Sequence, residues 1–222
     1  MAREIRLSMR VWDAPTRLFH WAVVLLVAFS YASESLNRMQ WHFWSGYAVL
    51  ALLLFRVAWG FVGSETARFS HFLRSPGTAF RYLMRFRERG PDSQIGHNAA
   101  GGWMVLVLLA LLLIQTGSGL FANDEVLSEG PLAHLVSPAA SDALTRIHGL
   151  VWNLLLAAVG LHVLAVLAYA VVRRQDLVRP MITGRKRLPA TQRQPRMASP
   201  LLAAALVVVA AGLIWALVTL GG

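Results

Sequence analysis

The sequence contains no cysteine and carries unusually little charge. The absence of cysteine excludes disulfide bonds, zinc–thiolate sites, iron–sulfur clusters and covalently attached c-type haem. Only 14% of the 222 residues are charged, whereas a soluble domain carries about a quarter. Any metal chemistry must therefore depend on the seven histidines, and a water-soluble globular domain is not expected.

Apolar residues make up 56% of the chain, and its mean hydropathy is +0.53. Five apolar runs are each long enough to cross about 30 Å of hydrocarbon, which takes about 20 helical residues. The expected spans are Leu18–Leu36, Trp41–Gly63, Gly101–Ala122, Ile147–Val172 and Pro200–Leu220. The first span lacks a small-residue cleavage site, so we expect it to be retained rather than removed as a signal peptide. The predicted fold is an all-α integral membrane bundle.

Lysine and arginine outnumber aspartate and glutamate by 21 to 11, which gives a formal net charge of +10. Eighteen of the 21 basic residues fall in residues 1–17, 64–100 and 173–198, which the five spans place on one side of the membrane. Basic loops stay in the cytoplasm. We therefore expect a bacterial inner-membrane protein in contact with lipid, with a cytoplasmic N-terminus and a periplasmic C-terminus. Nucleic-acid binding is excluded because the chain has too little soluble surface.

The expected organisation is a four-helix membrane domain at residues 1–175, a basic linker at 176–198 and a fifth membrane helix at 199–222. The loop at 64–100 has two interpretations. Apolar residues alternate with arginines around Pro76–Arg89, which is typical of a short amphipathic helix at a membrane surface. A solvated basic loop accounts for the same pattern.

Ionisable residues inside membrane spans are costly, and they usually have a function. His148 and His162 both lie in the fourth span, 14 residues apart. At 3.6 residues per turn they project from one helix face, separated by about 21 Å along the axis. One metal cannot bind both residues, but two stacked cofactors can.

Each cofactor then needs a second ligand at a matching depth. His20 begins the first span from the cytoplasmic side and matches His162, whereas His42 begins the second span from the outer side and matches His148. Two trans imidazoles suit a low-spin haem iron, and no other ligand set is available. The sequence therefore predicts two haems, although any one of these histidines taken alone fits a hydrogen-bonded structural role. We call His20 with His162 the inner pair, and His42 with His148 the outer pair.

Arg56 lies on the same helix face as His42, about 21 Å deeper. A buried guanidinium needs an anion, and a propionate of the inner haem is one candidate. The alternative is that Arg56 extends to the cytoplasmic interface. His97, Asn98 and Arg17 are candidates for a quinone site at the cytoplasmic mouth of the third span, although His97 also fits an ordinary helix-entry residue.

These motifs resemble the bacterial di-haem cytochromes of the b561 family, which includes the cytochrome b subunits of nickel–iron hydrogenases and formate dehydrogenase. The resemblance covers about residues 10–187. It rests on Val11–Trp21 (VWDAPTRLFHW), His42–Tyr47 (HFWSGY), Arg56–Ser64 (RVAWGFVGS), Gly96–Gly102 (GHNAAGG), the His148/His162 spacing and Met181–Lys186 (MITGRK). It implies a four-helix core with two non-covalent b haems, each held by two histidines.

The resemblance also implies electron transfer between the quinone pool and a partner protein. We expect the acidic outer loop Asn123–Thr145 to face a periplasmic c-type cytochrome or an oxidoreductase subunit. A proton- or ion-translocating protein and a haem-free structural anchor are the alternatives. The direction of electron flow and association into a homo-oligomer stay open, and His71 and His134 are expected to be ordinary interfacial residues.

Overall fold

The computed structural model describes residues 5–88, 94–123 and 128–221. Five long, apolar helices within these ranges confirm the predicted spans. They are α1 (Ala14–Ser35), α2 (Met39–Val62), α5 (Ala99–Gly119), α6 (Pro138–Val171) and α8 (Pro200–Gly221). At about 1.5 Å per residue, the 34 residues of α6 extend well beyond the thickness of the hydrocarbon.

Local sequence fixes where three of these helices begin. The side chain of Asp13 accepts a hydrogen bond of 2.7 Å from the backbone N–H of Thr16 at the start of α1. Asn98 caps α5 in the same way, and Ser137 caps α6. A side-chain oxygen at this position satisfies one of the N–H groups that the first helical turn leaves unpaired.

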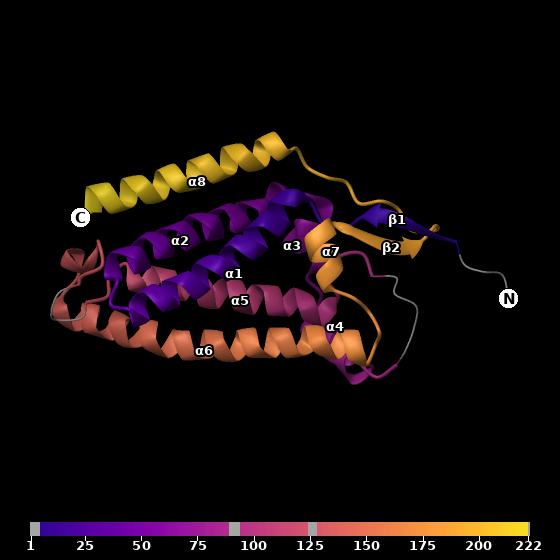
Figure 1. The fold of residues 1–222 in the computed structure, drawn as a ribbon, viewed down its shortest axis with the longest axis horizontal. Coiled ribbons are helices and arrows are strands. Elements are labelled where there is room, and N and C mark those ends of the chain that lie inside the picture. The colour runs from indigo at the N-terminus through magenta and orange to yellow at the C-terminus, as the bar shows by residue number, and fades with distance from the viewer. Residues whose placement is uncertain (1–4, 89–93, 124–127, 222) are drawn as a thin grey trace.

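The long helices form a bundle in which α1 packs against α2 and α5 packs against α6. Helix α8 lies along α2 at the edge of the bundle, with the C-terminal end beside the loops that precede α6 (Figure 1). An apolar core fills the centre of the four-helix part, where Leu53 of α2 meets Leu109 of α5 and Leu155 of α6. Leu155 is seven residues from each histidine of α6, so this core lies between the two histidine pairs.

One end of the bundle carries most of the arginines, and a small cap covers it. Strand β1 (Arg6–Arg10) pairs antiparallel with β2 (Arg185–Pro189), and α7 (Val178–Thr183) leads into β2. Figure 1 shows the two strands beyond the ends of the long helices. The expected linker at 176–198 thus contains a helix and a strand that contacts the N-terminal segment. Sequence patterns gave no indication of this pairing.

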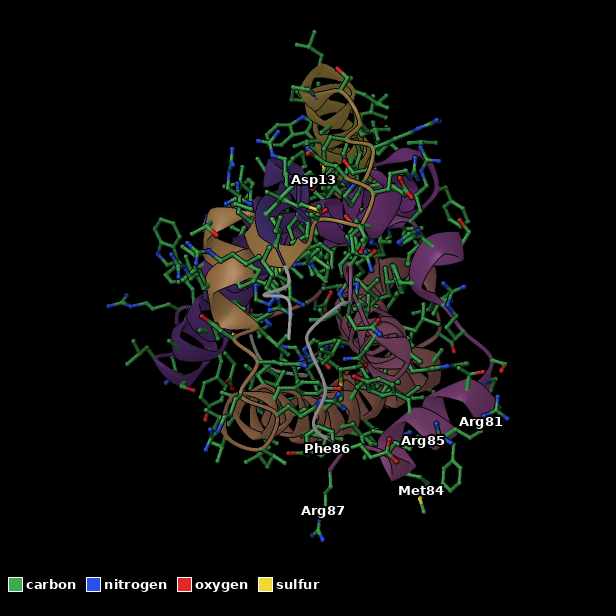
Figure 2. All side chains as sticks on the ribbon, turned by 90° about the vertical axis from the view of Figure 1, so that its right-hand side faces the viewer. Asp13, Arg81, Met84, Arg85, Phe86 and Arg87 are labelled. Carbon is green, nitrogen blue, oxygen red and sulfur yellow. The ribbon has the colours of Figure 1, made fainter. Side chains whose placement is uncertain are left out.

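The loop between α2 and α5 contains η1 (Glu65–Ala67), α3 (Phe69–Phe72) and α4 (Pro76–Met84). Helix α4 corresponds to the predicted amphipathic segment around Pro76–Arg89, although Arg89 lies outside the described residues. Its apolar residues Phe80, Leu83 and Met84 are exposed, as is Arg81. Figure 2 shows Arg81, Met84 and Arg85 at the periphery of this end, whereas Asp13 lies among the packed helices. This exposure is typical of a helix that lies at a membrane surface.

At the opposite end, η2 (Ala133–Leu135) precedes α6, and Asn123 bridges to Glu129. Of the predicted acidic loop Asn123–Thr145, Asp124 and Glu125 lie outside the described residues. Arg3, one of the basic residues from which the orientation is predicted, also lies outside the described residues.

Candidate functional site

The outer pair joins the start of α2 to α6. The ring centroids of His42 and His148 are 6.1 Å apart, and the ring planes meet at 77°. Two imidazoles that share one metal through metal–nitrogen bonds of about 2 Å have ring centroids about 6 Å apart. The observed spacing is therefore suited to two axial ligands on opposite sides of one metal.

Hydrogen bonds hold both rings of the outer pair. The Nδ1 of His42 is 3.0 Å from the backbone oxygen of Ser30 and 3.0 Å from its hydroxyl. The Nδ1 of His148 is 2.9 Å from the backbone oxygen of Gln115, with the hydroxyl of Ser118 at 3.5 Å. A carbonyl only accepts, so the Nδ1 of each ring carries the proton. The lone pair of Nε2 is then free to bind a metal.

A cavity of about 350 Å³ surrounds the outer pair, with walls from α1, α2, α5 and α6. Gly46 and Gly149 line this cavity. A Cβ atom built on either glycine would meet nothing within 4 Å. The two helices that carry the histidines therefore present bare backbone to an open volume, which allows a flat cofactor to approach them closely.

The inner pair lies at the other end of the bundle and joins α1 to α6. The ring centroids of His20 and His162 are 6.4 Å apart, with the ring planes at 54°. A Cβ on Gly160, two residues before His162, would also meet nothing within 4 Å. The buried Nδ1 of His20 has no hydrogen-bond partner among the described residues. The two pairings expected from topology thus correspond to the two ring contacts in the structure.

The donor set fits haem better than a free metal ion. In the described part of the chain, no three histidine, aspartate or glutamate side chains gather where they could hold one ion. Structural zinc takes four protein ligands and catalytic zinc three, whereas a haem iron needs only one or two axial ligands from the protein. Two opposed imidazoles beside open backbone therefore fit a haem better than a free ion. Ligation by these four histidines stays a prediction.

Arg56 lies inside the bundle, with only 2% of its side chain exposed. Its guanidinium stacks 5.3 Å from the centre of the Phe69 ring, and Nη1 has no partner in the described residues. The buried carboxylate of Asp13 lies nearby, but it already accepts hydrogen bonds from Thr16 and from the indole of Trp59 at 3.0 Å. This burial disagrees with an arginine that extends to the interface, and it leaves the guanidinium in need of an anion.

The three candidates for a quinone site have different surroundings. The ring of His97 lies between those of Trp12 and Phe72, with centroids 4.7 and 4.8 Å away, and its Nδ1 has no described partner. Burial, together with the charge of Arg56, lowers the pKa of His97 to about 3, so the ring is neutral at physiological pH. A neutral imidazole whose buried Nδ1 has no partner among the described residues can bind a polar ligand.

Asn98 and Arg17 have structural roles. Asn98 caps α5 through Gly101, and its amide also donates a hydrogen bond of 2.9 Å to the hydroxyl of Tyr169. Arg17 donates to the backbone oxygen of Ile182 and so fastens α7 to α1. Among the described contacts, no hydrogen bond or ring contact joins Arg17 to His97 or Asn98. A quinone site formed by His97, Asn98 and Arg17 stays a prediction.

The two remaining histidines lie away from both pairs. His71 is 3.8 Å from Glu65, and His134 is exposed in η2. Sequence reasoning did not single out Ser30, Gln115 or Ser118, which contact the outer pair. Polar residues within otherwise apolar helices were the available signal, but the acceptors nearest to both rings include backbone oxygens, which no residue type reveals.

Comparison with known proteins assigns the chain to a family. The family model described as prokaryotic cytochrome b561 matches residues 11–184, which include all four paired histidines. A probable Ni/Fe-hydrogenase B-type cytochrome subunit of Azotobacter chroococcum mcd 1 is 29% identical, over 78% of this chain and 86% of the relative. A protein of the same description from Bradyrhizobium diazoefficiens is 23% identical, over 82% and 87% respectively. No solved structure matches significantly. The chain belongs to the prokaryotic cytochrome b561 family, and it is a multi-pass membrane protein that transfers electrons through b-type haem.

Proposed function

We propose that the chain binds two b haems, one between His42 and His148 and one between His20 and His162, and conducts electrons across the membrane between them. The observation that carries this proposal is the pair of ring contacts at 6.1 and 6.4 Å on a single helix face of α6. Their α6 members are about 21 Å apart along the axis, which spans most of the hydrocarbon.

Bound haem supplies a reversible one-electron couple, and the protein controls where each haem sits and how its charge is compensated. The carbonyls of Ser30 and Gln115 fix the orientation of the outer imidazoles. Arg56 provides a buried positive charge for a propionate of the inner haem, because its guanidinium has no ion pair of its own within the described residues. The apolar core around Leu155 separates the two sites and keeps water from between them.

The proposed electron acceptor or donor at the arginine-rich end is a quinone of the membrane pool. His97 is the group best placed to contact a quinone carbonyl, since its buried Nδ1 has no partner among the described residues. A chain of ring contacts joins His97 to Arg56, because Phe72 contacts both His97 and Phe69, and the guanidinium of Arg56 lies over the Phe69 ring.

At the opposite end we propose a periplasmic redox partner, either a hydrogenase-type oxidoreductase subunit or a c-type cytochrome. The relatives described as hydrogenase cytochrome subunits support the first. In this orientation the arginine-rich cap lies in the cytoplasm, as the distribution of basic residues favours. Within the predicted docking loop, Glu129 and Asp142 are the described acidic residues that could attract a basic partner.

A reduced-minus-oxidised visible spectrum of the purified protein, combined with haem and protein quantification, tests the proposal. We expect the band of low-spin b haem at about two haems per chain, followed by bleaching of that band when an oxidising quinone analogue is added. A folded, colourless protein contradicts the proposal and favours the ion-translocating or anchoring alternative. A content of one haem per chain contradicts the paired arrangement.

A further inference from the structure

The two histidine pairs differ in what contacts their rings. At the outer pair, both Nδ1 atoms lie within 3.0 Å of backbone carbonyl oxygens, those of Ser30 and Gln115. At the inner pair, the buried Nδ1 of His20 has no partner among the described residues, and no described hydrogen bond involves the ring of His162. Both histidines of the outer pair are therefore hydrogen-bonded through Nδ1, whereas the described residues provide no such bond to the inner pair.

The charged residues near the two pairs also differ, with a negative residue at the outer pair and a positive one at the inner pair. Glu34 lines the cavity of the outer pair. The buried guanidinium of Arg56 lies at the inner end of the bundle, because its neighbour Phe55 belongs to an apolar cluster against which Phe19, next to His20, packs. Asp13 offsets part of that positive charge, but its carboxylate is already engaged with Thr16 and Trp59.

Both differences change the midpoint potential of a bound iron. A hydrogen bond from Nδ1–H to a carbonyl raises the basicity of the imidazole. A more basic ligand stabilises the oxidised iron and lowers the potential. A nearby positive charge instead stabilises the reduced iron, which carries one charge less, and so raises the potential.

We propose that the carbonyls of Ser30 and Gln115 act through His42 and His148 to make the outer haem the lower-potential site of the two. This inference rests on the proposed function, because it assumes that both pairs bind haem. Ser30 and Gln115 are positioning residues, which contact the ligands rather than the iron. Transfer of an electron from the outer haem to the inner one, which has the higher potential, is then favourable.

Gly119 offers a way to weaken one of these hydrogen bonds without changing charge. A Cβ atom at Gly119 would lie 2.9 Å from Cε1 and 3.1 Å from Nδ1 of His148, closer than side chains tolerate. In Gly119→Ala the imidazole must therefore move away from the carbonyl of Gln115, which lies one turn earlier on α5. Gly117→Ala is the matched control, because a Cβ there meets nothing within 4 Å.

The experiment is optical potentiometry of the purified holoprotein and of the two variants. We expect two components in the parent protein, of which Gly119→Ala raises only the lower one, while Gly117→Ala shifts neither. The proposal is overturned if the higher component responds to Gly119→Ala, or if neither component responds. Because the readout is a potential, a loss of activity for structural reasons does not imitate the expected result.

Ser30→Ala provides a second variant in case Gly119→Ala loses haem. It removes the hydroxyl that contacts His42 but leaves the carbonyl, so a smaller rise of the same lower component is expected. A rise of the higher component instead overturns the proposal. Two haems with the opposite order of potentials contradict this inference alone, whereas a protein without two haems contradicts the proposed function itself.

Discussion

The indole of Trp59 donates a hydrogen bond of 3.0 Å to the carboxylate of Asp13, which ties the last turn of α2 to the cap of α1. Both residues are buried, and Asp13 simultaneously accepts from the backbone of Thr16. One carboxylate thus fixes the start of the helix that carries His20 relative to the helix that carries Arg56.

Replacing Asp13 with alanine is expected to destabilise the fold through two effects. Loss of the cap costs about 0.5–2 kcal/mol, and the unpartnered indole N–H of Trp59 costs about 1–3 kcal/mol more. Thermal unfolding of the detergent-solubilised protein measures the change. Ser137→Ala is the control, because it removes only an exposed cap, that of α6. Equal effects of the two substitutions would show that the contact with Trp59 contributes nothing.

The two histidines of α6 are expected to hold different haems. His148→Ala should lose mainly the outer haem and His162→Ala the inner one, because each truncation removes one of two axial ligands. Haem content and difference spectra of the purified variants measure this. The exposed His134 supplies the control, since His134→Ala should retain both haems. Loss of the same spectral component in both α6 variants would show that the pairing is wrong.

Removing the charge of Arg56 is expected to lower the potential of the inner haem. Arg56→Gln removes the buried positive charge that favours the reduced haem and that would pair with a propionate. Arg56→Lys keeps the charge and should shift the potential less. Optical potentiometry reports both components. Arg81→Gln, at an exposed position on α4, should leave them unchanged. A larger shift of the outer component than of the inner one contradicts the proposed location of the charge.

Attachment of the segment before α8 is expected to depend on pH through Glu65. The backbone N–H of Arg196 lowers the pKa of this carboxyl, and the guanidinium of Arg193 and the ring of His71 add to the effect. A lowered folded-state pKa stabilises the folded state above the ordinary value of 4.5. That contribution is lost as the pH falls below 4.5 and through the folded-state pKa.

Limited proteolysis between residues 189 and 199 at several pH values measures this attachment. Cleavage should accelerate in acid, and Glu65→Gln should cleave faster at neutral pH with little dependence on pH. Glu88→Gln is a suitable control, because within the described residues Glu88 has only an exposed ion pair with Arg85 at 3.9 Å. If Glu65→Gln retains the acid acceleration of the parent protein, another group controls the attachment.

Helical periodicity and the distribution of arginines were sufficient to predict the five spans and to group the four histidines into two pairs. Both depend on regular geometry, since residues 14 apart on a helix share a face and consecutive spans alternate in direction. Helix α6 begins nine residues before the predicted span at Ile147, because its polar first turns extend beyond the apolar run.

Other features could not be predicted from sequence patterns, because they depend on backbone atoms or on contacts between distant segments. The acceptors of His42 and His148 include main-chain oxygens, which every residue possesses. The hydrogen bonds that link Asn98, Tyr169 and Tyr82 connect three separate elements, and nothing in any one of them indicates the others. The structural engagement of Arg17 with Ile182 arises in the same way.

The pairing of β1 with β2 also constrains the order of biogenesis. Strand β1 is synthesised before any span, and β2 only after the first four spans are complete. At about 5–20 residues per second, β1 waits on the order of ten seconds for its partner. The cap can therefore close only after α1, α2, α5 and α6 have been synthesised, so its closure marks completion of the four-helix unit.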